Sequence, residues 1–398
     1  MVLNMMKAIE IAENIYWVGA IDWNLRDFHG YSTHAGSSYN AFLILDEKVT
    51  LIDTVKKEYA SQLIARISDI IDPKKIDIVI SNHAEMDHSG SLFEVMHRIG
   101  EDKPIICSAM GEKALKRHFT RNWNYRVVKD GEELSIGKRT LQFFETRMLH
   151  WPDSMFSYLK EDEILFSSDA FGQHYAGPER FDDDISPEIW YQAKKYYANI
   201  LLPYSELILK LIGKVKSAGL NFNMICPDHG IIWRISPLSI IEAYNVWAIQ
   251  EPTRYALVIY DTMWSSTKRM AEEIVEALES YDVYAKSMHI KGHDRSEIMT
   301  EILNAGAVII GSPTINNGLY PTIADFLCYF KGLKPVNKVV AAFGSYGWSG
   351  EAVKLINDTF DSMKLNTVDS VRSQYLPDED CIRSCHELAK KVAEQLPY

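Results

Sequence analysis

The chain is poor in cysteine, and the few cysteines that it has do not form a disulfide pattern. Their odd number and wide scatter indicate free thiols in a reducing compartment; they are Cys107, Cys226, Cys328, Cys381 and Cys385. Cys381 and Cys385 would share one face of a helix. We expect them to be buried as small apolar side chains rather than to act as a redox pair.

The chain also lacks an excess of basic residues and a long apolar run. Its net charge of −12 leaves no basic face for nucleic acid or for an anionic membrane surface. No stretch approaches the roughly 18 apolar residues that would suggest a membrane-spanning helix. Lys7 and Glu10 interrupt the N-terminal stretch, which has no small-residue cleavage site, so we expect no signal peptide. The sequence therefore predicts a cytoplasmic protein with neither nucleic acid nor membrane as a partner.

The length of 398 residues predicts two domains, and the two halves have different patterns. Up to about residue 251, paired strands mix with helices, which suggests a two-sheet sandwich with helices outside. From residue 254, strands alternate strictly with helices, which indicates a doubly wound parallel sheet. Its five strand candidates are 254–262, 282–290, 307–314, 338–347 and 367–376. We expect one domain over 1–251 and a second over 252–398.

The strongest chemical signal is a group of ligand-type side chains directly after the apolar run 76–81. His83, Glu85, Asp87 and His88 lie within six residues, where loop side chains can converge on one point. Asp87 could instead cap the next helix, and the histidines could lie on the surface. Three further residues favour the metal site, because each follows its own predicted strand: His150, Asp169 and His229.

This pattern is similar to that of the metallo-β-lactamase superfamily, whose zinc motif is H-x-H-x-D-H followed by a distant His, Asp and His. The resemblance implies an αββα sandwich for the first domain. Here Glu85 replaces the second histidine of the motif. A carboxylate in place of an imidazole makes the site harder and more suited to iron than to zinc. Glu85, Asp87 and Asp169 would nearly balance the charge of two ferrous ions.

The whole chain resembles the flavodiiron proteins, or A-type flavoproteins, through the H-x-E-x-D-H motif and the segments His150–Asp153, Ser168-Asp169 and Asp228-His229-Gly230. The resemblance implies two non-haem iron ions per subunit. One iron would be held by His83, Glu85, His150 and Asp169, and the other by Asp87, His229 and the bridging Asp169. It leaves open whether His88 is a ligand or is replaced by water. It also implies supporting catalytic roles for His29 and Tyr197, although both could equally be ordinary surface or core residues.

The second domain predicts a flavin site. In a flavodoxin-like five-stranded sheet of order 2-1-3-4-5, ligands bind at the carboxyl ends of the strands near the switch point. The loops after strands 1, 3 and 4 are rich in hydroxyl, amide and glycine residues there. A helix N-terminus in the first loop could hold a phosphate. The dinucleotide fingerprint G-x-G-x-x-G is absent from this turn, which disfavours NAD or FAD as the cofactor. The predicted FMN residues are Thr262, Met263, Trp264, Ser265, Ser266, Thr267, Pro313, Thr314, Ile315, Asn316, Asn317, Ser345, Tyr346, Gly347, Trp348, Ser349 and Gly350.

The resemblance implies an enzyme that reduces dioxygen to water, nitric oxide to nitrous oxide, or both, and the preference between the gases stays open. It also implies a head-to-tail homodimer or a dimer of such dimers. Because the chain has no C-x-x-C pairs, we expect no fused rubredoxin domain and an external donor. That donor would be rubredoxin, with a reduced deazaflavin or a flavin reductase as alternatives. The competing hypotheses are a metal-dependent hydrolase fused to a flavodoxin domain and a plain electron carrier.

Overall fold

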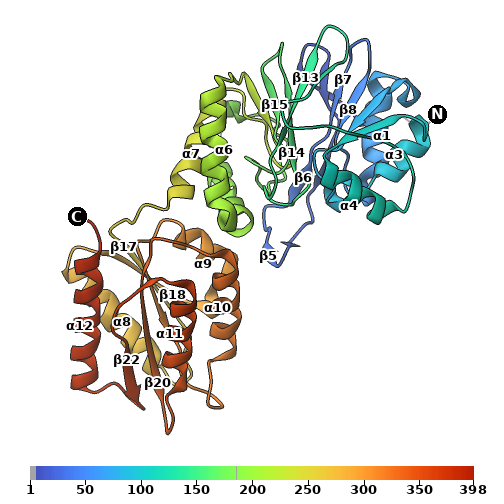
Figure 1. Cartoon of the computed structure of the whole chain (residues 1–398). Helices are drawn as coiled ribbons and strands as arrows, with labels where there is room; N and C mark the ends of the chain where they lie inside the picture. The colour runs from blue at the N-terminus through green and yellow to red at the C-terminus, as the bar shows by residue number, and fades with distance from the viewer. Residues whose placement is uncertain (1–5, 185) are drawn as a thin grey trace. The chain divides into compact units, whose positions relative to one another are not determined.

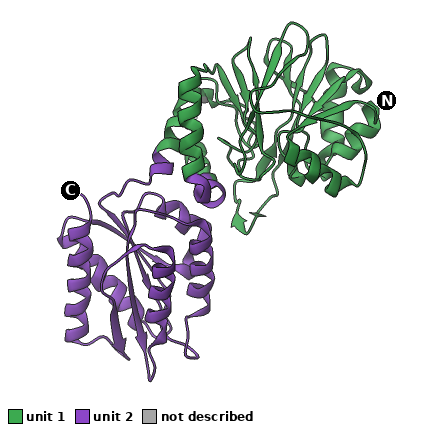
Figure 2. Ribbon diagram, in the orientation of Figure 1, with its two compact units in different colours: residues 1–196, 206–245 green, residues 197–205, 246–398 purple. Residues whose placement is uncertain are grey.

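The computed structural model describes residues 6–184 and 186–398, which divide into two units (Figure 2). The first unit comprises residues 1–196 and 206–245, and the second comprises 197–205 and 246–398. The sequence placed the division after residue 251, and that boundary stays a prediction for the functional domains. The units differ from it mainly at segment 197–205, which groups with the C-terminal part of the chain.

Two sheets form the centre of the first unit (Figure 1). Within the described residues, one sheet has seven strands in the order β1-β2-β7-β8-β9-β10-β11. These strands are β1 (Ile9–Ala12), β2 (Ile15–Trp17), β7 (Phe42–Ile44), β8 (Thr50–Ile52), β9 (Ile78–Ile80), β10 (Pro104–Cys107) and β11 (Asn124–Val127). The other described sheet has five: β12 (Glu133–Ser135), β13 (Thr140–Glu145), β14 (Met155–Leu159), β15 (Ile164–Phe166) and β16 (Met224–Cys226).

Buried side chains fill the space between these sheets and also lie beneath the outer helices. Phe42 and Ile80 of the first sheet share a core cluster with Phe143 and Phe166 of the second. Another cluster joins the opposite face of the first sheet to the helices beside it. Figure 1 shows α1, α3 and α4 on that side and α6 on the other side of the pair of sheets. The expected αββα sandwich is confirmed.

The helices and short helical turns between residues 57 and 249, of which η4 and η5 belong to the second unit, have the following bounds. They are η1 (Lys57–Tyr59), α1 (Ala60–Ile70), η2 (Pro73–Lys75), α2 (Met86–Ser89), α3 (Leu92–Ile99), α4 (Ala109–Phe119), η3 (Asp182–Asp184), α5 (Pro187–Tyr196), the π-helical turn η4 (Tyr197–Leu201), η5 (Leu202–Tyr204), α6 (Ser205–Ala218) and α7 (Pro237–Ile249). Two small ribbons are separate from the main sheets: β3 (Ala20–Asp22) with β6 (Ser37–Tyr39), and β4 (Asp27–Phe28) with β5 (Tyr31–Ser32).

The second unit is built on a parallel sheet of order β18-β17-β19-β20, with β21 and β22 both beside β20. The strands are β17 (Tyr255–Tyr260), β18 (Tyr284–His289), β19 (Ala307–Gly311), β20 (Val339–Tyr346), β21 (Asn366–Thr367) and β22 (Val371–Gln374). The expected order 2-1-3-4-5 is confirmed, and the fifth position is shared by two short strands. β21 pairs with the start of β20 and β22 with its end.

Helices cover both faces of this sheet, as strands that are apolar throughout require. Ala256 and Val258 of β17 pack with α8 and α12, and the residues between them face the opposite side. Cys381 and Cys385 are buried in this core as free thiols, as expected. The helices are α8 (Ser266–Ser280), η6 (Ile290–Gly292), α9 (Arg295–Ile302), α10 (Pro321–Leu333), α11 (Glu351–Met363) and α12 (Glu379–Gln395). This is the expected flavodoxin-like architecture.

Candidate metal centre and C-terminal pocket

The loop after β9 carries the first ligand-type residues, and buried polar contacts fix its path. Asn82 donates from its backbone N to Asp53 Oδ1 at 2.7 Å and from Nδ2 to Asp53 Oδ2 at 2.8 Å. The chain then passes His83 and enters the short helix α2, which carries Asp87 and His88. The loop therefore holds several ligand-type side chains on a backbone that is anchored to the neighbouring strand ends.

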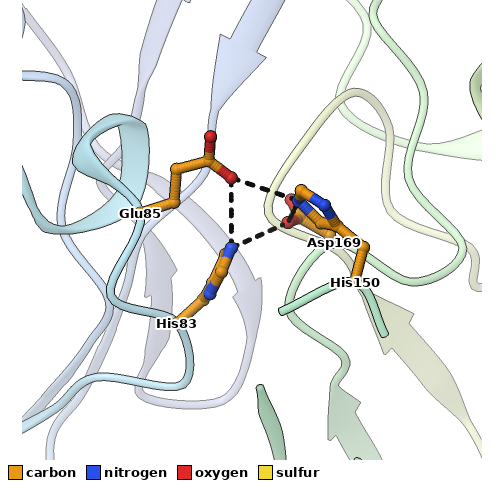
Figure 3. A group of neighbouring side chains, drawn as sticks. All are labelled: His83, Glu85, His150 and Asp169. Atoms are coloured by element: carbon orange, nitrogen blue, oxygen red, sulfur yellow. Dashed lines mark hydrogen bonds and ion pairs between the residues drawn. The ribbon is translucent and has the colours of Figure 1, made fainter. Parts of the chain in front are cut away.

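His83, Glu85, His150 and Asp169 form one group whose ligand atoms lie within 4.8 Å of one another (Figure 3). Glu85 Oε2 lies 3.2 Å from His83 Nε2 and 3.1 Å from His150 Nε2. Asp169 Oδ2 lies 3.4 Å from His83 Nε2 and 3.1 Å from His150 Nε2. Two imidazole nitrogens and two carboxylates thus point at a common centre.

Asp87, His88 and His229 form a second group next to the first. His229 Nε2 lies 3.2 Å from Asp87 Oδ2 and 3.2 Å from His88 Nε2. The other carboxylate oxygen of Asp169, Oδ1, lies 3.1 Å from His88 Nε2 and 3.4 Å from His229 Nε2. Each oxygen of Asp169 therefore faces a different group, which is the arrangement of a carboxylate that bridges two cations.

The chemistry of these groups fits a pair of metal ions. Both carboxylate oxygens of Asp87, and Oδ1 of Asp169, are buried without a hydrogen-bond donor. Burial alone would raise the pKa of Asp169, but nearby imidazoles, chiefly His88, hold that pKa well below its usual value. Burial would likewise lower the pKa of His150, whereas hydrogen bonds to Asp169 and Glu85 raise it to about 9. Buried oxygens without donors, surrounded by imidazoles, are typical ligands of a first-row transition metal.

Outer contacts fix which nitrogen of two imidazoles faces the centre. His83 Nδ1 donates to Asp153 Oδ2 at 3.0 Å, and the backbone N of Ala84 donates to the same oxygen at 2.6 Å. His229 Nδ1 donates to the carbonyl of Ser38 at 2.7 Å. Because Nδ1 carries the proton in both rings, Nε2 is left as the free electron-pair donor.

The β4–β5 hairpin brings His29 to the same place. His29 and Gly30 form its two-residue loop with φ angles of 53° and 72°, the positive values that a type I′ turn requires. His29 Nε2 lies 2.6 Å from Glu85 Oε1, and this hydrogen bond raises the pKa of His29 above its usual value. The preceding Phe28 packs its ring against His174 and His229, at centroid distances of 5.0 and 6.2 Å.

Tyr197, the other candidate catalytic residue, is fully buried in the second unit. Its hydroxyl lies 2.9 Å from Ser205 Oγ, and its ring centroid lies 5.5 Å from that of Trp247. The preceding residue, Tyr196, packs against His229 with ring centroids 6.0 Å apart, as Tyr39 does at 5.9 Å. Sequence spacing alone does not distinguish these neighbours, because both lie in one continuous helical stretch.

A cavity of about 540 Å³ lies at the carboxyl ends of the second unit's strands. Thirteen of its lining residues belong to the predicted set: Met263, Trp264, Ser266, Pro313, Thr314, Ile315, Asn316, Asn317, Ser345, Tyr346, Gly347, Trp348 and Ser349. Thr262, Ser265, Thr267 and Gly350 were also predicted and lie beside the cavity in sequence without lining it. The buried Thr262 Oγ1 has no hydrogen-bond partner, so it can donate to an acceptor such as a phosphate oxygen.

Tyr375 and Leu376 also line the cavity, and the sequence analysis missed them. They follow β22, which pairs with the end of β20. The backbone N of Tyr375 donates to the carbonyl of Tyr346 at 2.8 Å, so the two loops are joined. Tyr375 is an aromatic residue at the end of the last predicted strand, and this position could have indicated that it lines the cavity.

In the described part of the chain, helices that combine the length and the apolar character needed to cross a bilayer are absent.

Comparisons with known proteins agree with both halves of this geometry. Residues 38–230 match the family described as "ODP family beta lactamase", and residues 258–388 match the family described as "Flavodoxin". The chain is 42% identical to the nitric oxide reductase of Moorella thermoacetica, over 98% of this chain and 100% of that one.

Solved structures are similar over nearly the whole chain. The rubredoxin oxygen:oxidoreductase from Desulfovibrio gigas superposes with a TM-score of 0.95 at 43% identity, covering 98% of each chain. The flavodiiron protein from Giardia intestinalis superposes with a TM-score of 0.93 at 33% identity, covering 98% of this chain and 96% of that one.

Proposed function

Because the chain belongs to the flavodiiron protein family, we propose that it is an oxidoreductase that reduces nitric oxide to nitrous oxide, dioxygen to water, or both. The reaction takes place at a non-haem di-iron centre that receives electrons through FMN. The first domain, residues 1–251, carries the iron, and the second, residues 252–398, carries the flavin.

The observation that carries this proposal is the position of Asp169 between the two ligand groups. Its Oδ2 faces His83 and His150, and its Oδ1 faces His88 and His229. His83, Glu85, His150 and Asp169 would hold one iron ion. Asp87, His229 and Asp169 would hold the other, with His88 beside them. When bound, such a pair of ferrous ions supplies electrons to a small oxidant.

Residues around the centre orient the ligands and hold a proton at its edge. Asp153 and the carbonyl of Ser38 fix the tautomers of His83 and His229. His29 holds a proton at Nε2 on the outer oxygen of Glu85, and its side chain is 39% exposed. It thus connects solvent with the centre, where the reduction of either gas consumes protons. A supporting role for Tyr197 remains a prediction, supported only by the family resemblance.

The C-terminal pocket suits FMN because hydroxyl groups, amides and aromatic rings together line it. Ser266 lines it at the start of α8, where helix N–H groups point outward, and would bind the phosphate with Thr262 and Thr267 beside it in sequence. Tyr346 and Trp348 line the cavity and offer aromatic faces to the isoalloxazine.

Three further proposals concern partners and location. Rubredoxin is the expected external electron donor, because a similar chain of known structure carries the name rubredoxin oxygen:oxidoreductase. A head-to-tail homodimer, or a dimer of such dimers, would bring the flavin of one subunit to the iron of the other. A cytoplasmic location fits the scattered free cysteines.

Metal and flavin analysis combined with gas kinetics tests the function. Anaerobically purified protein should contain two iron ions and one FMN per chain, with little zinc. The reduced protein is then mixed with dioxygen or with nitric oxide in a stopped-flow instrument, and oxidation of the flavin is followed by its absorbance. Rapid oxidation by at least one gas is expected. A zinc-loaded protein that neither gas oxidises would contradict the proposal and favour the hydrolase.

A further inference from the structure

His174 lies directly behind the second ligand group but belongs to neither group. Its side chain is fully buried. Its ring centroid is 4.5 Å from that of His229, at an interplanar angle of 62°, and 5.1 Å from that of Tyr196. Its Nδ1 lies 2.8 Å from Ser37 Oγ, whereas Nε2 has no hydrogen-bond partner. A buried imidazole held by a single hydroxyl therefore packs against a ligand-type residue.

The hydrogen-bond directions in this group can be assigned from the types of atom involved. His229 Nδ1 lies 2.7 Å from the carbonyl of Ser38, which can only accept, so Nδ1 must carry the proton. Ser37 Oγ lies 3.3 Å from the same Nδ1 and can accept a second, weaker share of that proton. The hydroxyl of Ser37 donates to the carbonyl of Ser38 at 3.1 Å, so its oxygen must accept from His174 Nδ1 at 2.8 Å. His174 thus carries its proton at Nδ1 and leaves Nε2 unprotonated.

We propose that His174 is a positioning residue for His229, and that it controls how tightly the second of the two metal ions is held. The inference rests on the proposed di-iron function. By donating to Ser37 Oγ, His174 engages the other oxygen that lies within reach of His229 Nδ1, at 3.3 Å. The carbonyl then remains the acceptor for His229 Nδ1, and Nε2 stays directed at Asp87.

Without a donor at position 174, Ser37 Oγ would be open to His229 Nδ1 and would compete with the carbonyl of Ser38 for its proton. The ring of His229 would also lose the flat surface that supports it. The effect should be confined to the second ion. In the first group, Asp153 accepts a hydrogen bond from His83 and supports that ligand independently. None of the contacts described above joins the first group to His174.

Two substitutions separate hydrogen bonding from packing. His174→Phe keeps an aromatic ring but removes the donor, whereas His174→Asn places an amide nitrogen close to the position of Nδ1. Ser37→Ala removes the oxygen that would compete for the proton of His229. His97→Asn is the matched control, because His97 is an exposed histidine that stacks on Phe93 far along α3.

The full-length, FMN-loaded protein is stripped of metal and titrated anaerobically with ferrous iron, and free iron is measured after dialysis. We expect His174→Phe to bind its second iron ion about 10- to 100-fold more weakly, as is usual when an outer support of a ligand is lost. The first ion should bind as in the wild type. His174→Asn should recover most of the affinity. Ser37→Ala, which removes the competing oxygen, should bind both ions as the wild type does, and His97→Asn should also behave as the wild type.

Several results would overturn the inference. Two ions bound by His174→Phe with wild-type affinity would show that the residue supports nothing. Equal weakening of both ions, or equal weakening in His174→Phe and His174→Asn, would show a general packing role instead. Weaker binding of the second ion by Ser37→Ala would overturn it as well, and thermal unfolding of each variant identifies a misfolded one. A wild-type protein that binds no iron would refute the di-iron function itself, which is a different outcome.

Discussion

Removing the Asp169 carboxylate should weaken both metal positions at once, whereas removing Glu85 should weaken one. Asp169 presents Oδ2 to one pair of imidazoles and Oδ1 to the other, at distances from 3.1 to 3.4 Å. Glu85 directs Oε2 to His83 and His150 and directs Oε1 to His29, so it serves the first group alone. The two alanine variants therefore differ in how many ions they affect.

The size of the effect follows from this count. A hydrogen bond or contact to a charged group contributes about 1.5–3 kcal/mol, so each ion that loses its carboxylate should bind about 10- to 150-fold more weakly. Asp169→Ala should lose that amount at both ions, or about 3–6 kcal/mol in total. Glu85→Ala should lose it at the first ion only.

Iron content after purification and anaerobic ferrous titration of the metal-free protein measure both variants. Asp182→Ala is the control, because this aspartate is also buried but accepts backbone hydrogen bonds from residues 234 and 235, away from the centre. FMN content should stay the same in all three proteins. If Asp169→Ala lost affinity for one ion only, or for neither, Asp169 would not bridge two ions and the assignment of ligands would be wrong.

Three further predictions address the metal, the flavin and the stability of the site. Glu85→His restores an imidazole-rich set of ligands and should raise the zinc-to-iron ratio of protein grown with both metals; an unchanged ratio would show that Glu85 does not select the metal. Thr267→Asp places a carboxylate beside the expected phosphate, so FMN should be lost while iron is retained, which absorbance and metal analysis report together. Asp153→Leu leaves the N–H groups of His83 and Ala84 without an acceptor and should cost roughly 2–6 kcal/mol of unfolding free energy; denaturant titration of the metal-free protein would contradict this if stability were unchanged.

The sequence predicted those features whose chemistry is concentrated along the chain. Four ligand-type residues stand within one loop, and His150, Asp169 and His229 each follow a strand, so strand ends alone indicate that they converge. Strict alternation predicted a parallel sheet, and the strand order came from its likeness to flavodoxin. That order placed three loops at one edge, and the cavity there is lined by residues from all three.

Tyr375 and Leu376 line the cavity but were not among the residues predicted from the sequence. Their loop reaches the cavity because β22 pairs with the end of β20, whereas β21 pairs with the start of that strand. The sequence pattern predicts one strand for each position in the sheet. It does not show that two short strands share the fifth position. It therefore does not show that the last loop reaches as far as the loop after β20.

The supports of the metal centre were hidden for a different reason. Ser37, Ser38 and Asn40 are common residue types in an ordinary stretch of chain, and no motif distinguishes them from surface serines and asparagines. In the structure they lie under the turn that carries His229. Ser38 accepts from Gly230 N at 2.7 Å, and Asn40 Nδ2 donates to the carbonyl of Gly230 at 3.0 Å. Metal ligands need particular side chains and so leave a motif, whereas the groups that orient them need only a donor or an acceptor at the right point. Sequence motifs therefore identify the candidate ligands of this centre, and only the fold identifies the groups that determine their geometry.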